Sequence, residues 1–214
     1  MPVLTNIGTL ATCRDEGGQE DIHVIEDAAM AWRNGTVAWV GAARALPEAY
    51  AGEPTIDAAG RLVVPGLVDA HTHLAFGGWR ADEFELRLRG ASYLEIARRG
   101  GGIRSTMRAT RAAWEDERFD RRRTCRQEMA RRGGRTVEAK SGYGLNVDDE
   151  LKTLRVYRRL RQTQPQTIVP TFLGAHTVPP EFESDRAGYL RLLTDELIPR
   201  IADEGLAEYC DALM

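Results

Sequence analysis

The stretch VVPGLVDAHTHLAFGG, residues 63–78, decides the fold of the larger part of this chain. An apolar run covers residues 62–74, and two histidines, His71 and His73, stand near its end. The pair Gly77-Gly78 follows directly. A continuous apolar run is typical of a strand that is buried on both faces of a parallel sheet. We therefore expect a central strand here, followed by a glycine loop.

After this run the sequence predicts strands and helices in alternation. We expect helices at about 82–98, 103–132, 146–163 and 186–204 and strands within 135–144, 167–180 and 206–214, with Pro199 kinking or splitting the last helix. Alternating strands and helices form a parallel sheet, either a barrel or a doubly wound sheet. No GxGxxG motif follows the first strand, which disfavours a dinucleotide-binding fold. A complete (β/α)8 barrel takes about 250 residues, so four barrel strands here amount to half a barrel.

The first 62 residues have a different pattern, with short strands and turns. Residues 36–41, TVAWVG, are rich in β-formers and follow Asn34-Gly35, a strong hairpin-turn signal. Residues 60–66 read as a further strand. We therefore predict a small β domain over residues 1–62 and an α/β domain over residues 63–214.

Composition narrows the class of protein and its partners. With 29% charged residues and a formal net charge of -3, the chain carries no overall field that attracts nucleic acid or an anionic membrane. No apolar run reaches the length of a membrane span, and the N-terminus shows no secretory signal pattern. Cys13, Cys125 and Cys210 are far apart, which is typical of a reducing compartment. We expect a cytoplasmic protein that binds neither nucleic acid nor a membrane.

His71 and His73 are candidate metal ligands. Side chains at positions i and i+2 of a strand point to the same side, so the two imidazoles project together. Two imidazoles at a strand end suit a divalent metal ion, although a catalytic metal usually has about three protein ligands. The alternative is a pair of core histidines that bond to backbone carbonyls, and the two-residue pattern leaves both interpretations open.

Further polar side chains follow the other predicted strands and the glycine loop. Arg80 offers a guanidinium that can grip a carboxylate. Tyr143 lies between two glycines, and His176 directly follows a strand. Each has a plain alternative: a surface arginine, a packed loop tyrosine, a histidine bonded to backbone. Lys140 is either a carbamylated metal bridge or an ion-pair partner, and we favour the ion pair. In a barrel the ends of the strands converge on one face, which predicts a shared site.

Four segments together resemble the imidazolonepropionase family of the amidohydrolase superfamily. They are PGLVDAHTHLAFGGWR, GGGIRSTMRAT, TVEAKSGYG and TFLGAHTVP, in this order. The resemblance implies a metal-dependent hydrolase of histidine degradation that opens the ring of 4-imidazolone-5-propanoate to N-formimidoyl-L-glutamate. It implies an amidohydrolase-type (β/α)8 TIM barrel, present here as about half a barrel, with part of a small β-sandwich.

The resemblance also implies roles for individual residues. His71 and His73 would bind one zinc or iron ion, Arg80 would hold the carboxylate of a small-molecule substrate, and Tyr143 and His176 would contact the substrate. The general base and the remaining metal ligands would come from strands beyond residue 214, and the relatives suggest a homodimer. Two alternatives stay open: another amidohydrolase, such as a ring deaminase, and a non-catalytic metal-binding fragment.

Overall fold

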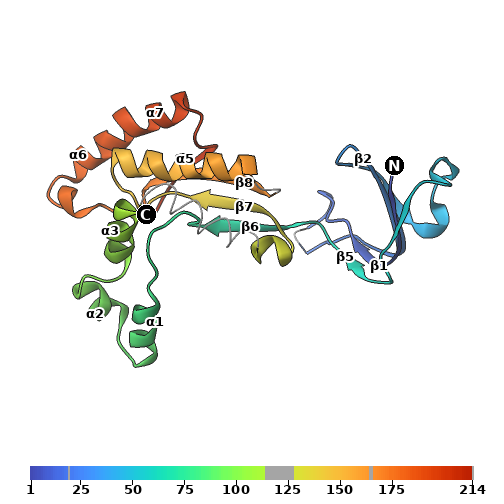
Figure 1. Cartoon of the computed structure of the whole chain (residues 1–214), viewed down its shortest axis with the longest axis horizontal. Coiled ribbons are helices and arrows are strands. Elements are labelled where there is room, and N and C mark those ends of the chain that lie inside the picture. The colour runs from blue at the N-terminus through green and yellow to red at the C-terminus, as the bar shows by residue number, and fades with distance from the viewer. Residues whose placement is uncertain (19, 114–127, 164–165, 214) are drawn as a thin grey trace. The chain divides into compact units, whose positions relative to one another are not determined.

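The computed structural model describes residues 1–18, 20–113, 128–163 and 166–213 (Figure 1). These residues form two compact units, Met1–Gly66 and Leu67–Met214. The division lies after Gly66, whereas the sequence placed it after residue 62. Proline and glycine stand side by side at this joint, where the chain leaves one sheet and enters the next.

The first unit is a mixed sheet with the strand order β3-β2-β1-β4, in which β5 also pairs with β1. Its strands are β1 (Val3–Ala11), β2 (Val24–Arg33), β3 (Thr36–Ala42), β4 (Thr55–Asp57) and β5 (Leu62–Val63). Asn34 and Gly35 join β2 to β3 with φ values of 52° and 79°. Positive φ at both central residues is the mark of a type I′ hairpin turn, so the predicted turn is confirmed.

The predicted continuous strand over residues 62–74 is wrong, because the structure splits it. Strand β5 ends at Val63, and β6 (Leu67–Thr72) begins in the second unit. Pro65 has no backbone N–H with which to continue a sheet ladder, so the run is interrupted there. The expected burial on both faces is also wrong, since Val68 is 65% exposed. The reason is that β6, within the described residues, pairs only with β7 and forms an edge of its sheet.

The second unit is built on a parallel sheet with the order β6-β7-β8-β9. Strands β7 (Gly134–Lys140), β8 (Thr167–Ala175) and β9 (Tyr209–Ala212) lie where the sequence predicted strands. Figure 1 shows α5 (Val147–Thr163) running along this sheet. Each strand is followed by helical connections and pairs with the next, as in half of a (β/α)8 barrel. The predicted fold class is confirmed.

The first two predicted helices are shorter than expected. A single helix over 82–98 is wrong: α1 (Ala81–Leu88) and α2 (Tyr93–Arg98) are separate. Gly90 follows α1 with a φ of 93°, a backbone conformation that ends a helix. Ser92 then caps the start of α2 with a capping box. Helix α3 (Ile103–Ala112) covers the start of the predicted 103–132 helix, and residues 128–131 near its end are helical as well. Ala113 is extended, and residues 114–127 of that prediction lie outside the described residues.

The last predicted helix contains a widened turn. It begins as α6 (Arg186–Arg191), passes through a π-helical turn at Leu192–Leu197 and ends as α7 (Ile198–Asp203). Pro199 cannot donate a backbone hydrogen bond, and its ring would collide with the preceding turn of a regular helix. The π-helical turn just before the proline accommodates both constraints. No helix among the described residues is long and apolar enough to cross a membrane.

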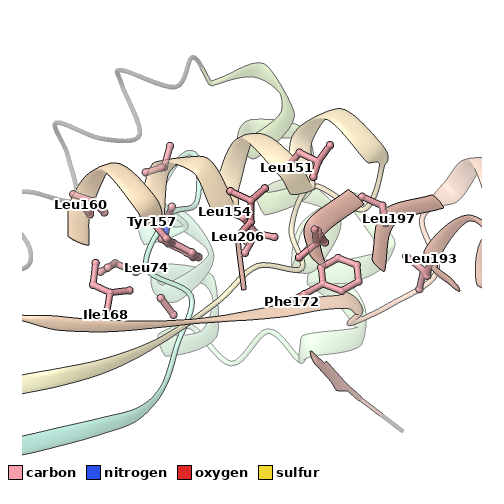
Figure 2. Packing of buried hydrophobic residues seen from close by; sticks show 14 of the residues in the cluster. Leu74, Leu151, Leu154, Tyr157, Leu160, Ile168, Phe172, Leu193, Leu197 and Leu206 are labelled. Carbon is pink, nitrogen blue, oxygen red and sulfur yellow. The ribbon is translucent and has the colours of Figure 1, made fainter. Parts of the chain in front are cut away.

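The core of the second unit lies between α5 and the sheet. Figure 2 shows the buried side chains that α5 presents toward β8 and the last helices. The cluster includes Leu151, Leu154, Tyr157, Leu160, Ile168, Phe172, Leu193, Leu197 and Leu206. Leu151, Leu154 and Leu160 of α5 are at most 1% exposed. This packing fixes α5 against the strands that carry the candidate site residues.

Tyr157 links this core by hydrogen bonds to the chain at the end of β7 and just after β6. Its hydroxyl donates a hydrogen bond of 2.8 Å to the Lys140 carbonyl at the end of β7. The same hydroxyl accepts a 3.1 Å hydrogen bond from the Ala75 N–H, two residues after His73. Both backbone groups are buried, and buried polar groups need partners. One phenol therefore joins α5 to the segments that carry the two candidate metal ligands and the tyrosine loop.

We expect Tyr157→Phe to destabilise the second unit by about 1–3 kcal/mol, because two buried backbone groups lose their partner. Urea-induced unfolding measures this change in free energy. The control is Tyr209→Phe, since Tyr209 is 63% exposed and should leave the midpoint unchanged. A Tyr157→Phe midpoint equal to that of the wild type would contradict the bridging role.

Candidate functional site

The candidate site lies where β6, β7 and β8 end. His71 is the second-last residue of β6 and is exposed, while His73 follows the strand and is half-buried. Their ring centroids are 5.8 Å apart with the rings nearly perpendicular. The two imidazoles therefore lie side by side at the carboxyl end of one strand, with one of them facing solvent.

Tyr143 and His176 come to the same place from the next two strands. The Tyr143 ring lies 4.5 Å from the ring of His73, and the His176 ring stacks on His73 at 4.8 Å. Tyr143 and His176 are 5.2 Å apart. The parallel sheet thus brings three separate sequence clusters into one contact group, which is the geometry expected for the ends of barrel strands. The chemical roles of these residues stay predictions.

Arg80 lies at a cavity of about 330 Å³ beside this group. The cavity is lined by His73, Phe76, Gly78, Trp79, Arg80, Thr106 and Tyr143. Arg80 Nη1 lies 3.5 Å from Glu83 Oε2, and 39% of the Arg80 side chain is exposed. Its guanidinium is therefore available to a ligand. His176 lines a different cavity, of about 610 Å³, with residues of α6 and β9.

The aromatic wall of the smaller cavity was not anticipated from the sequence. Phe76 and Trp79 meet edge to face at 5.4 Å, and Phe76 lies 6.4 Å from Tyr143. Neither Phe76 nor Trp79 was among the residues predicted to form the site. The signal was present in the run FGGWR, where two glycines bring the flanking side chains back toward each other. Flat aromatic walls suit a planar ligand.

The environment sets the protonation states of the two half-buried rings. Burial, helped by the neighbouring His176, lowers the pKa of His73 to about 4. His73 is therefore neutral at physiological pH, which is the form that binds metals. Burial also raises the pKa of Tyr143, although Arg80 acts against this. Tyr143 is therefore a protonated phenol and can donate a hydrogen bond.

A hydrogen bond fixes the ring of His176. Its Nδ1 lies 2.8 Å from the carbonyl oxygen of Gly142. A carbonyl only accepts hydrogen bonds, so Nδ1 carries the proton and donates it. In the neutral imidazole this leaves the lone pair on Nε2. The loop before Tyr143 thus determines which nitrogen of His176 can accept a hydrogen bond.

The two strand-end histidines fit part of a metal site. The Nδ1 atom of His73 is buried and has no hydrogen-bond partner within the described residues. Such an atom costs free energy unless it finds a partner, and a cation would serve. Across the described ranges, however, no group of three or more His, Cys, Asp or Glu residues is arranged to hold a metal. Metal binding by His71 and His73 stays a prediction, and a site at this strand end would need further ligands.

Lys140 is an ion-pair partner in this structure. Its Nζ lies 2.6 Å from Glu138 Oε1 and 2.8 Å from Asp211 Oδ2. Burial acts to lower the pKa of Lys140, but the hydrogen bonds to Asp211 and Glu138 raise it above 10.5. An amine must be neutral to form a carbamate, so this setting opposes the metal-bridge interpretation. The expected ion pair is therefore present, but Asp211 lies 71 positions further along the chain and was not predicted as its partner.

The family comparison agrees with the site. Residues 54–132 match the model of the amidohydrolase family. The imidazolonepropionase of Cupriavidus taiwanensis is 50% identical over 188 residues, which cover 88% of this chain and 45% of the relative. That of Porphyromonas gingivalis is 46% identical and covers 97% of this chain and 51% of the relative. The chain belongs to the amidohydrolase family. It spans about half the length of the imidazolonepropionases that it matches.

Solved structures show the same fold at low sequence identity. The 5-methylcytosine deaminase of Klebsiella pneumoniae, liganded with phosphonocytosine, aligns over 97% of this chain and 42% of its own with a TM-score of 0.59 at 20% identity. A mutant of atrazine chlorohydrolase from Arthrobacter aurescens, complexed with zinc and atraton, aligns over 85% of this chain and 37% of its own with a TM-score of 0.51 at 17% identity. These likenesses support the fold of this amidohydrolase chain.

We expect Lys140→Met to destabilise the second unit by about 1–3 kcal/mol at neutral pH, because two carboxylates lose a hydrogen-bonded cation. The pKa of Lys140 is raised in the folded state, so its contribution is complete below about pH 10.5 and is lost as the pH rises through the folded value. The stability difference between wild type and variant should therefore shrink in urea titrations above about pH 10.5.

The matched control is Lys152→Met. Lys152 is the only other lysine of the sequence and pairs with Asp149 at 2.6 Å. Its side chain is 28% exposed, compared with 7% for Lys140, so its removal should cost less. Equal costs for the two lysines would contradict the special setting of Lys140.

Proposed function

We propose that this chain carries the substrate-binding face and two metal ligands of an imidazolonepropionase. The reaction would be the hydrolytic opening of the ring of 4-imidazolone-5-propanoate to N-formimidoyl-L-glutamate, a step of histidine degradation in the cytoplasm. The observation that carries the proposal is the cavity of about 330 Å³ in which Arg80 faces an aromatic wall and His73. The similarity to imidazolonepropionases, near 50% identity, supports the same assignment.

The cavity matches a planar ring that bears a carboxylate. A guanidinium binds a carboxylate through two parallel hydrogen bonds, and Arg80 is the cationic residue that lines this cavity. Phe76 and Tyr143 offer ring faces and edges for a flat heterocycle. In this arrangement Arg80 would fix the propanoate end of the substrate while the aromatic residues orient its ring.

The residues at the strand ends would serve the reacting end of the substrate. A zinc or iron ion held partly by His71 and His73 would supply Lewis-acid polarisation of a carbonyl and a more acidic water. Neutral His73 is in the protonation state that a ligand needs. Tyr143 would donate its phenolic hydrogen bond to the substrate. His176, held through Nδ1 by Gly142, would present Nε2 to the same molecule.

A ring deaminase of the same family is the alternative that Arg80 distinguishes. A neutral nucleobase has no carboxylate, so a deaminase of this kind would gain little from a guanidinium in the cavity. The presence of Arg80 beside the aromatic wall therefore favours the carboxylate-bearing substrate. The other alternative, a non-catalytic metal-binding fragment, would bind the metal without hydrolysing the substrate.

We expect purified chain to bind about one zinc or iron ion and to lose it in the double variant His71→Ala, His73→Ala, because the two imidazoles supply adjacent ligands. Elemental analysis after removal of free metal measures the stoichiometry. His23→Ala is the control, since His23 lies in the first unit and should leave the metal content unchanged. Equal metal content in the double variant and the wild type would rule out these two ligands.

We expect Arg80→Met to weaken binding of imidazole-4-propanoate by about 10- to 100-fold, which corresponds to one charge-assisted hydrogen-bonded pair. Binding of imidazole itself, which has no carboxylate, should change little. Calorimetric titration gives both affinities. Arg89→Met is the matched control, because Arg89 is exposed at the end of α1 and pairs with Glu85. An equal loss for both ligands would contradict recognition of the carboxylate.

A further inference from the structure

A buried carboxylate lies directly behind the tyrosine loop. Glu150 is in the first turns of α5 and is fully buried. Its Oε1 accepts hydrogen bonds from the backbone N–H groups of Gly144 at 2.8 Å and Leu145 at 2.9 Å. The N–H of Gly142 lies 3.1 Å from both of its oxygens. One carboxylate thus gathers three N–H groups of a loop that is only a few residues long.

Burying the Glu150 carboxylate and bending the loop around it both cost free energy. A buried carboxylate must be fully hydrogen-bonded to be tolerated in the interior. The loop around it contains Leu145 with a φ of 55°, which a leucine rarely adopts. Gly142 has a φ of 98°, and a Cβ at this position would lie 2.5 Å from the Leu173 carbonyl oxygen. Unfavourable backbone geometry of this kind gathers where a loop must hold a defined shape for function.

The loop that Glu150 holds carries Tyr143 and forms a hydrogen bond with His176. Tyr143 lies between Gly142 and Gly144, whose N–H groups both bond to the carboxylate. The carbonyl of Gly142 accepts the Nδ1 hydrogen of His176 from the next strand. Glu150 itself does not line the cavity that contains Tyr143 and Arg80. Its influence on that cavity must therefore pass through the backbone of residues 142–145.

We propose that Glu150 is a positioning residue that sets both Tyr143 and His176 against the substrate by holding the loop 142–145. The proposal rests on the proposed function for the identity of the ligand, but the holding of the loop is a property of this chain alone. Because Glu150 acts through one loop, its substitution should disturb Tyr143 and His176 together. A carboxylate that merely stabilised α5 would disturb neither.

The first measurement is residue-resolved amide hydrogen exchange in Glu150→Gln. A glutamine keeps the shape of the side chain but loses the charge and turns one acceptor into a donor that opposes the Gly142 N–H. We expect the amides of Gly142, Gly144 and Leu145 to exchange about tenfold faster or more. The matched control is Asp148→Asn, which removes a charge from the same helical turn at an exposed position. Unchanged exchange in Glu150→Gln would overturn the proposal.

The wild type keeps the proposal testable if Glu150→Gln does not fold. In the wild type these three amides should exchange as slowly as those of buried positions in α5, such as Leu154. Exchange of the three amides at the rate of an unprotected peptide would overturn the proposal without any variant. Slow exchange, in a loop that is otherwise free of regular sheet or helix, supports it.

The second measurement is a double-mutant cycle on the affinity for imidazole-4-propanoate. We expect Glu150→Gln to weaken binding about tenfold in the wild-type background and less than about twofold in a Tyr143→Phe, His176→Ala background. Equal weakening in both backgrounds would overturn the positioning role. If the wild type does not bind imidazole-4-propanoate, the proposed function fails, while amide exchange still decides whether Glu150 holds the loop.

Discussion

The parallel alignment of β6, β7 and β8 is the constraint on which the rest of this structure depends. Parallel strands end at a common edge, so the residues that follow each strand meet even though they are far apart in the sequence. His73, Tyr143 and His176 come into ring contact because they follow three neighbouring strands of this sheet. The helices between the strands set their separation in the sequence. The hydrogen-bonded pairing of the strands sets the distances between their side chains.

Two side chains of α5 turn this common edge into a defined site. Tyr157 ties the end of β7 to the segment after His73, and Glu150 gathers the loop that carries Tyr143. Both act on backbone atoms and both are buried in the interior. The helix that covers the sheet thus also determines the shape of the loops at its edge. Packing and site geometry are consequently properties of the same element.

Local patterns in the sequence predicted what local interactions determine. The Asn34-Gly35 turn, the helix α5 and the strands β7 and β8 follow from short-range patterns and were predicted. The meeting of Tyr143, His73 and His176 followed from strand ends alone. Metal ligation by His71 and His73 stays a prediction.

What the sequence did not reveal depends on distant partners or on a single interrupting residue. Pro65 divides an apolar run that looked like one strand. Among the described residues β6 pairs only with β7, and no local pattern in the sequence records this. The Lys140–Asp211 pair joins residues from different strands. Glu150 was not predicted as a site residue, because its hydrogen bonds to three backbone N–H groups depend on the fold of the loop before α5.

The order of pairing in the two sheets has a consequence for how the chain acquires its structure during synthesis. The strands that the described residues contribute to the first sheet all end by residue 63, so they can pair with one another once that residue has left the ribosome. Strand β6 ends at residue 72, but its partner β7 ends only at residue 140. At about 5–20 residues per second, β6 waits roughly 3–14 s for a partner. Throughout that interval the strand that bears His71 is an unpaired apolar segment, and chaperones that recognise such segments have seconds in which to engage it.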